Sequence, residues 1–371
     1  MTFRSHEKSN SRVAALPPGI SLYLDVVRFS AAMAVFLGHA SGHLLTQGFL
    51  WQFSEFMQTS VIVFFVLSGF VIASVLDQRE RDPVTYAQQR VARLYSVIIP
   101  ALILTAVCDA IGLSQNPDLY YNGPWTYPHD NQTSRYFLTF SMLNGTWIWP
   151  NMEPGINAPF WSLSFEAFYY AFIGLIFFAS GKFRILSIAS LSLIAGPAIN
   201  ALFPIWLLGF AVYHLSRRRV LSPIWGGPAA AFGLALLLIS PILRENMPNF
   251  AFGIFHREGM VVDYIDGIAF SLHLYGMMSY DGWVGRWLGA CRKPIRWLGS
   301  LTFALYLFHR PLIQLFAAVP IAEPSAWSQR IYLLGGTFLI VATVGRRCEL
   351  WKYSIGAALR TLHRRMEARR A

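Results

Sequence analysis

An arginine and a histidine interrupt the apolar segment at residues 24–40, where Arg28 precedes His39 by eleven positions. At roughly 3.6 residues per turn this is almost three whole turns, so both side chains project from one helix face, about 16 Å apart along the axis. Charged groups at membrane depth are costly and usually face a bundle interior or a site. The spacing therefore predicts that Arg28 and His39 line one wall of a polar site.

Asp25 lies three residues before Arg28, a spacing that allows a salt bridge within the helix. This pair leaves a second interpretation open, in which Asp25 and Arg28 are structural partners and His39 is a histidine at a helix end.

A carboxylate, Glu166, follows in the apolar segment NAPFWSLSFEAFYYAFIGL, about two turns from its outer end. A carboxylate within reach of an imidazole orients it and raises its basicity, as a general base requires. We expect Glu166 at the depth of His39, although it can instead pair with another helix. Ser68 and Gly69 lie at the centre of a further apolar segment, where small residues permit close approach of a ligand or of a neighbouring helix.

Two further pairs of polar residues have helical spacing. Arg90 and Arg93 are neighbours at one end of an apolar segment, where two guanidiniums can bind phosphates bidentately or simply anchor the helix at the cytoplasmic face. Tyr306 and His309 lie one turn apart in the segment GSLTFALYLFHRPLI. Both residues are expected to line the polar site. For His309 the alternative is a hydrogen-bonded histidine of the core.

The composition identifies the class of protein that must position these residues. Of 371 residues 55% are hydrophobic and 13% charged, which is too apolar for a soluble domain and predicts a polytopic membrane protein. The net charge of +11 comes without a nucleic-acid-binding motif on a soluble face, so no nucleic-acid partner is expected. The three scattered cysteines and the histidine spacing predict neither a disulfide framework nor a metal site.

By the length rule for membrane helices we expect an all-α bundle of about ten transmembrane helices. Their approximate ranges are 20–40, 58–76, 94–113, 159–178, 185–198, 201–215, 223–243, 261–276, 297–317 and 330–346. The two between 184 and 217 must be short or tilted and turn near residues 197–204. Around this transmembrane domain, at 20–346, we expect a cytoplasmic N-terminal segment at 1–19 and a basic cytoplasmic tail at 347–371.

The positively charged residues fix the expected orientation, because Lys and Arg gather in cytoplasmic loops. With the N-terminus inside, most of the 30 Lys and Arg fall in inner segments. The outer segments hold only Arg135, Arg244, Arg257 and Arg330. Both termini are therefore expected in the cytoplasm. The longest loop, at about 114–158, faces outward, and its Asn, Tyr, Trp, Pro and Gly content suits a folded lid, a carbohydrate-facing surface or an ordinary ordered loop.

Taken together these residues resemble the acyltransferase-three family, whose first helix carries an arginine, ten residues and a histidine. The resemblance runs over roughly residues 21–345 and includes SGF at 68–70, RVARLY at 90–95, WSLSFE at 161–166 and LYLFHRPL at 305–312. Departures are Gln89 and Ser96 around the third-helix motif, and Glu349, which lacks the proline that commonly follows, so no role is transferred to Glu349. The chain also lacks the SGNH-type hydrolase domain of some relatives, which implies a standalone enzyme.

The resemblance implies a membrane-bound O-acyltransferase, and the basic, Arg-rich inner segments indicate a bacterial inner membrane. It would transfer an acyl group, most often acetyl, from acetyl-CoA as donor substrate to a hydroxyl of an envelope or secreted carbohydrate, such as exopolysaccharide or lipopolysaccharide, without a bound cofactor. His39, oriented by Glu166, would be general base or transient acyl carrier. The expected substrate-binding residues are Arg28, Arg90, Arg93, Ser68, Tyr306 and His309. Polysaccharide-assembly proteins are expected as further partners.

Two other functions fit the same residues. Intramembrane Arg, His and Glu residues also mark the pathways of transporters and proton relays, although no repeated halves are visible. A noncatalytic component of a polysaccharide-assembly complex is the other alternative.

Overall fold

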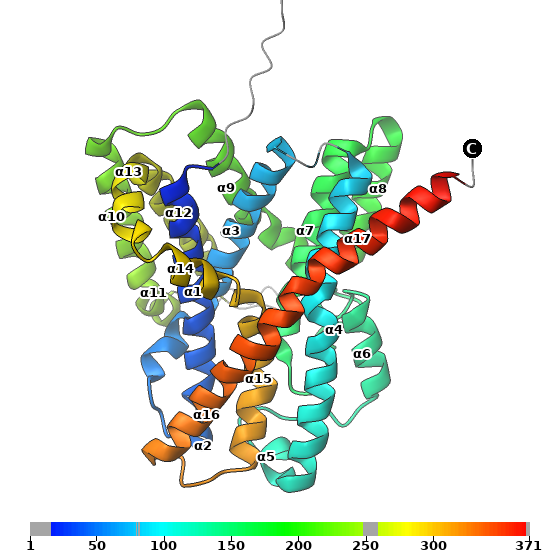
Figure 1. Cartoon of the computed structure of the whole chain (residues 1–371), viewed down its shortest axis with the longest axis vertical. Helices are drawn as coiled ribbons and strands as arrows, with labels where there is room; N and C mark the ends of the chain where they lie inside the picture. The colour runs from blue at the N-terminus through cyan, green and yellow to red at the C-terminus, as the bar shows by residue number, and fades with distance from the viewer. Residues whose placement is uncertain (1–15, 79, 81, 248–258, 369–371) are drawn as a thin grey trace, which may run out of the picture.

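The computed structural model describes residues 16–78, 80, 82–247 and 259–368, and every regular element in these ranges is a helix (Figure 1). This confirms the predicted all-helical fold. Most of the predicted N-terminal segment and Arg257 of the predicted outer segments lie outside the described residues. The helices of the first half are α1 (Pro18–Ala40), α2 (His43–Thr46), η1 (Trp51–Phe56), α3 (Met57–Gln78), α4 (Pro83–Gln115), α5 (Pro117–Tyr121), α6 (Gln132–Phe140), η2 (Ala158–Phe160) and α7 (Trp161–Phe178).

The second half continues the bundle in the same way. Its helices are α8 (Gly181–Ala195), α9 (Pro197–Arg218), α10 (Pro223–Leu238), α11 (Ser240–Asn246), α12 (Met260–Met277), η4 (Met278–Tyr280), α13 (Asp281–Gly289), α14 (Arg292–Gly299), α15 (Thr302–Ala318), α16 (Trp327–Ile340), the π-helix η5 (Val341–Gly345) and α17 (Arg346–Ala368). Residues predicted to form a tail thus make α17, which crosses the front of the bundle in Figure 1 and packs against α4.

The number of spans differs from the expected ten. A helix lies in each predicted range, but among the described residues only six are long and apolar enough to cross a membrane, or eight if the bent pairs α10–α11 and α14–α15 each count as one. Helix α8 has 15 residues, fewer than the roughly 20 of a straight span. Helix α12 carries the buried charges of Asp263 and Asp266. Ten spans are therefore not confirmed.

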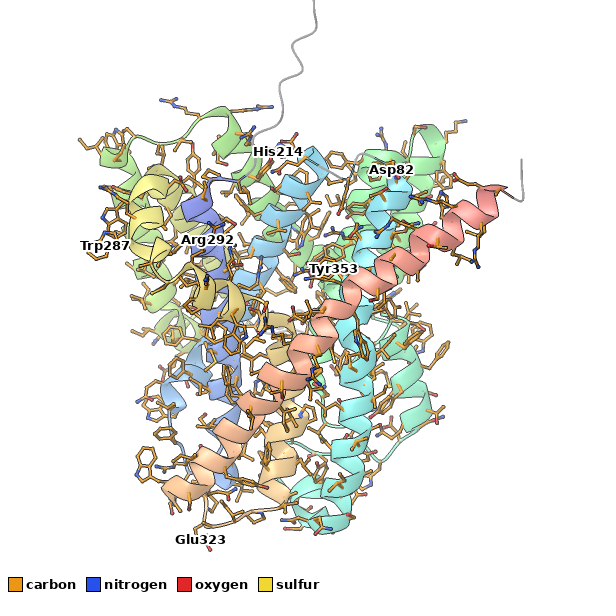
Figure 2. All side chains as sticks on the ribbon, viewed as in Figure 1. Asp82, His214, Trp287, Arg292, Glu323 and Tyr353 are labelled. Carbon is orange, nitrogen blue, oxygen red and sulfur yellow. The ribbon has the colours of Figure 1, made fainter. Side chains whose placement is uncertain are left out.

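The two ends of the bundle can be told apart by the residues they hold. Figure 2 shows Asp82 and His214 at one end, which is also where α1 begins and which we call the Pro18 end. Glu323 lies at the other end with α2 and α5, which we call the Ala40 end. Trp287 lies on one side of the bundle, at the left of this view.

Local sequence signals explain where the helices start and turn. Asp82 caps α4, since its Oδ1 accepts a hydrogen bond from Thr85 N at 2.8 Å, and Pro83 follows as the first helical residue. Between α8 and α9 the chain turns at Gly196, whose φ of +80° suits glycine, and Pro197 starts the next helix. The predicted turn near residues 197–204 thus falls at its start, and Pro204 lies inside α9.

A close crossing of α3 and α9 fixes the helix that carries Ser68. A Cβ added to Gly69 would lie 2.0 Å from the Trp206 carbonyl oxygen, and one added to Gly209 would lie 1.8 Å from the Val66 carbonyl oxygen. Both positions therefore need glycine, because no side-chain atom fits between the backbones.

A buried ionic cluster joins α11 to α12. Arg244 Nη2 lies 2.9 Å from Asp263 Oδ1 and 2.6 Å from Asp266 Oδ2, and both aspartates are fully buried. Thr59 and Ser240 donate further hydrogen bonds to Asp266, at 2.9 and 3.0 Å. Arg244 is one of the few arginines predicted on the side of the Ala40 end. The cluster explains its presence there, because two carboxylates neutralise the charge of its guanidinium.

Candidate functional site

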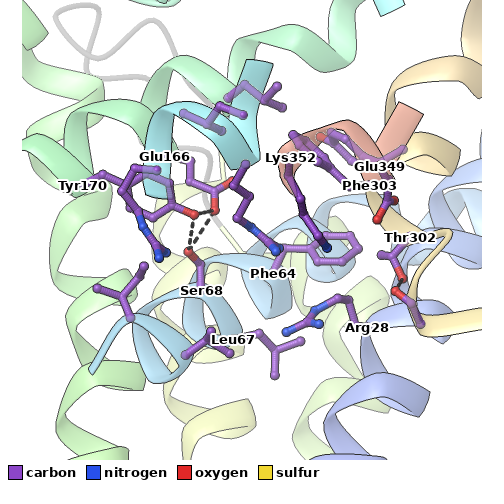
Figure 3. Close-up of a pocket in the computed structure, with 18 of the residues that line it drawn as sticks. Arg28, Phe64, Leu67, Ser68, Glu166, Tyr170, Thr302, Phe303, Glu349 and Lys352 are labelled. Atoms are coloured by element: carbon purple, nitrogen blue, oxygen red, sulfur yellow. Dashed lines mark hydrogen bonds between the residues drawn. The ribbon is translucent and has the colours of Figure 1, made fainter. Parts of the chain in front are cut away.

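A cavity of about 800 Å³ lies between α1, α3, α4, α7, α14, α15 and α17 (Figure 3). Most of the residues singled out from the sequence line it: Arg28, Ser68, Arg90, Arg93, Glu166 and Tyr306. His39 and His309 do not line this cavity. The predicted common wall of Arg28 and His39 is therefore not formed in this cavity, which Arg28 lines and His39 does not.

Basic side chains outnumber acidic ones in the cavity wall. The cations are Arg28, Arg90, Arg93, Arg296, Lys352 and Arg360, and the carboxylates are Asp25, Glu166 and Glu349. The predicted pair of Arg28 with Asp25 is confirmed at 3.6 Å, and Arg296 also contacts Asp25.

The paired and unpaired cations of α4 and α17 differ in what they can offer a ligand. Arg90 is held by Glu80 at 2.6 Å and lies against the rings of Tyr86 and Tyr170. Arg93 and Lys352 form no ion pair with a carboxylate of the described residues. This wall suits a ligand that carries several negative charges.

Glu166 is held inside the cavity by two hydroxyl groups. Its Oε1 accepts a hydrogen bond from Ser68 Oγ at 2.9 Å and another from the Tyr170 hydroxyl (Figure 3). Tyr170 is four residues further along α7 and hence on the same face. The predicted contact between Glu166 and His39 is not formed, so Glu166 does not orient the imidazole in this structure.

His39 is instead oriented by a second histidine. His39 Nδ1 lies 2.9 Å from the Val35 carbonyl oxygen and 3.2 Å from His309 Nε2, and His309 Nδ1 lies 2.9 Å from the Leu305 carbonyl oxygen. Carbonyl oxygens only accept, so each Nδ1 must carry a proton, and neutral His309 then presents an acceptor at Nε2. This assignment, made from the hydrogen-bond network, places the lone pair of neutral His39 on Nε2, which no described residue hydrogen-bonds.

Tyr306 connects the cavity with the histidine pair. Its ring lines the cavity, its hydroxyl lies 2.9 Å from Ser162 Oγ, and its ring centroid is 6.3 Å from that of His309. The two predicted residues of α15 thus occupy the boundary, Tyr306 on the cavity side and His309, fully buried, beyond it.

The structure adds residues that the sequence did not single out. Tyr170, Arg296, Glu349 and Lys352 all line the cavity, and Glu349 Oε1 accepts a hydrogen bond from Ala304 N at 3.1 Å. The spacing of Tyr170 from Glu166 was a usable signal. Glu349 matches a glutamate of the family pattern without its usual proline, so no role was assigned to it. Lys352 has no signal, because a basic amphipathic stretch at the end of a chain equally describes a surface helix. Among the described residues no group of three or more His, Cys, Asp or Glu side chains is arranged to hold a metal ion.

The segment between α6 and α7 holds a carboxyl group with a shifted pKa. Burial raises the pKa of Glu153 to about 7, against smaller lowering effects from its own backbone, Arg135 and Arg310. Arg135 also fixes this segment, since its Nη1 donates to the Asn151 and Glu153 carbonyl oxygens at 2.8 and 3.2 Å. Glu153 is accordingly protonated in the folded protein at pH values where it would ionise in an unfolded chain.

This shift makes the stability of the protein depend on pH. The protonated Glu153 stabilises the fold fully below its ordinary pKa of 4.5, and this contribution is lost as pH rises towards about 7. Glu153→Gln keeps the neutral form, so we expect its apparent Tm to match wild type near pH 4.5 and to exceed it increasingly up to pH 7. Thermal unfolding of both purified proteins across this range measures the effect, and parallel curves would show that Glu153 does not titrate there.

Comparison with known proteins identifies the family of the chain. A family model described as an acyltransferase domain matches residues 21–345. The peptidoglycan O-acetyltransferase OatA of Listeria monocytogenes is 24% identical over 360 residues, which cover 85% of this chain and 53% of that protein. The chain thus spans about half the length of this relative. No solved structure matches the chain. The family match covers most of the sequence and confirms the resemblance drawn from its motifs, so this protein belongs to the acyltransferase-3 family of membrane acyltransferases.

Proposed function

We propose that the protein transfers an acetyl group from acetyl-CoA to a hydroxyl of an envelope carbohydrate, with His39 as the general base. The observation that carries this proposal is the separation of a cation-rich cavity from a histidine pair, with Tyr306 at their boundary. Acyl transfer needs both a site that binds a polyanionic donor and a base beside the acceptor. The O-acetyltransferase activity named for the relative supports the acetyl group and the carbohydrate acceptor.

The cavity suits coenzyme A in size and charge. At about 800 Å³ it falls in the range of sites for small molecules, roughly 300–1,000 Å³. Arg93 and Lys352 are the cations best placed to hold phosphates, and Arg28 lies deeper on α1. The neutral pantetheine arm would then extend past Phe64, Thr302 and Tyr306 towards the histidines.

The chemical step follows from the free lone pair on His39 Nε2. This nitrogen takes the proton of the acceptor hydroxyl as the oxygen attacks the thioester carbonyl carbon. The tetrahedral intermediate collapses, the C–S bond breaks, and the His39 imidazolium returns its proton to the departing sulfur, which leaves the O-acetyl ester and free CoA. The same nitrogen would bear the acetyl group if transfer took two steps.

The protein would lie in a bacterial inner membrane. The distribution of Lys and Arg supports an orientation in which the Pro18 end faces the cytoplasm. Acetyl-CoA would then enter from the cytoplasm and the carbohydrate from the opposite side. Such a protein would work beside the assembly machinery of its polysaccharide.

Replacing a donor-binding arginine tests this proposal directly. We expect Arg93→Met to raise the KM for acetyl-CoA roughly 10- to 100-fold, the value of one or two charge-assisted contacts to phosphate. The measurement is the transfer of radiolabelled acetyl from acetyl-CoA to the carbohydrate fraction of membranes that contain equal amounts of each protein.

Arg286→Met is the matched control, because Arg286 is exposed on α13 and lines no part of the cavity. It should leave the KM unchanged. An unchanged KM in Arg93→Met would remove the donor from this cavity. If the wild type transfers no label to any carbohydrate, the proposed function itself fails, and a transporter would be indicated by solute movement without an acylated product.

A further inference from the structure

Arg310 is a cation of α15 to which neither the fold nor the proposed step assigns a role. Its side chain is partly buried, and its Nε is buried without a hydrogen-bond partner. No hydrogen bond or ion pair joins its guanidinium to a described residue. A buried N–H group that makes no hydrogen bond costs folding free energy. A guanidinium with free N–H groups in this position therefore points to a ligand.

The guanidinium lies over an aromatic ring that also contacts the proposed base. Arg310 Cζ is 4.6 Å from the centroid of the Trp125 ring, and that centroid is 5.7 Å from the centroid of the His39 ring. All three side chains are partly exposed, in contrast to the fully buried His309. A cation, an indole and an unpartnered imidazole nitrogen therefore meet at one place near the Ala40 end of α1.

The segment that carries Trp125 is held in place against α15. Gln314 Nε2 donates to the Leu119 carbonyl oxygen at 3.0 Å, and Tyr127 N donates to the Tyr120 carbonyl oxygen at 2.7 Å. These contacts lie on either side of Trp125 in the chain. The indole is thus positioned before any ligand arrives, which lowers the entropy cost of binding.

The charges around Arg310 decide the kind of ligand. Asp109 and Glu153 lie close enough to interact electrostatically with the guanidinium, and Asp109 Oδ1 has no hydrogen-bond partner. Neither carboxyl group adds positive charge for an anionic ligand. A carboxyl oxygen accepts hydrogen bonds whether the group is protonated or ionised, and the guanidinium donates them, so the place suits a ligand rich in hydroxyl groups, which both donate and accept.

We propose that Trp125 and Arg310 form the acceptor subsite, where one neutral sugar ring lies against the indole and its hydroxyls bind Arg310 beside His39 Nε2. This inference rests on the proposed acetyl transfer and names the part of the molecule that holds its acceptor. The indole supplies a flat apolar face for the C–H groups of the ring, and the guanidinium fixes which hydroxyl reaches the base.

Acceptor kinetics test the subsite separately from the donor cavity. Trp125→Ala and Arg310→Lys are compared with wild type in membranes, with radiolabelled acetyl-CoA and soluble oligosaccharides released from the host's cell envelope. We expect each variant to raise the KM for the oligosaccharides about tenfold or more and to leave the KM for acetyl-CoA unchanged. Trp125→Phe, which keeps an aromatic face, should retain part of the affinity.

Trp149→Ala is the matched control, since Trp149 belongs to the same long connection, is 37% exposed and has no recorded contact with Arg310 or His39. An oligosaccharide KM in Arg310→Lys and Trp125→Ala equal to that of this control would overturn the subsite while acetyl transfer stands. A raised KM for acetyl-CoA in the same variants would also overturn it, because the defect would then be one of folding. Absence of transfer by the wild type would overturn the proposed function and the subsite together.

Discussion

His39→Ala should lower kcat for acetyl transfer by about 10³-fold, within the range that general bases contribute. The KM for acetyl-CoA should change little, because His39 lies outside the lining of the cavity proposed to bind the donor. The reason for the loss is specific: the variant removes the Nε2 lone pair, the only imidazole nitrogen of the pair that carries no hydrogen bond within the described residues. Initial rates at saturating donor, in membranes with matched protein levels, measure it.

Two further variants separate chemistry from packing. His43→Ala is the control, since His43 is an exposed histidine at the same end of the bundle and should leave the rate unchanged. His39→Gln fills the space and offers hydrogen bonds but no basic nitrogen, so it should be as inactive as His39→Ala. Wild-type rates in His39→Gln would exclude His39 from proton transfer and from acyl transfer through its nitrogen.

Arg244→Met should lower the free energy of unfolding by about 3–5 kcal/mol, the cost of breaking a buried ion pair by removing one partner. The substitution leaves Asp263 and Asp266 fully buried beside each other without their common cation. Thermal unfolding of the purified protein in detergent measures the effect as a lower apparent Tm.

A triple variant distinguishes charge imbalance from lost packing. Arg244→Met combined with Asp263→Asn and Asp266→Asn removes all three charges, and it should recover most of the Tm that Arg244→Met loses. None of the three residues lines the cavity, so the KM for acetyl-CoA of the folded protein should stay at the wild-type value. A single variant as stable as wild type would show that the two carboxylates are not both charged in the fold.

Helix positions and the inner cavity were predictable from the sequence, and the partners of the key side chains were not. Long apolar segments fix where helices lie, and helical spacing correctly paired Asp25 with Arg28. It also indicated residues of five helices that share one cavity, from Arg28 to Tyr306. Such predictions need only the spacing of residues along one helix, or the expectation that residues of different helices lie at the same depth in the membrane.

The predicted contact of Glu166 with His39 was wrong, because it rested on depth along the helix alone. Counting turns gives depth but not rotation about the helix axis, so it placed Glu166 near His39 when α7 turns the carboxylate towards Ser68. The true partner, His309, is 270 residues away in sequence and is brought to His39 by the packing of α1 against α15. The count of ten spans is not confirmed for a different reason, because α12 buries its aspartates against protein and needs no uniformly apolar sequence.

The excess of cations in the cavity has a consequence for how the enzyme would respond to metabolism. In the proposed function Arg93 and Lys352, which line the cavity, would hold the donor by its phosphates, and these are unchanged when the acetyl group leaves. Binding energy of this kind is the same for acetyl-CoA and for free CoA. Free coenzyme would therefore compete with acetyl-CoA on nearly equal terms, and the rate would follow the ratio of the two in the cell. Envelope modification would slow when acetyl units are scarce, even if the total coenzyme pool is constant.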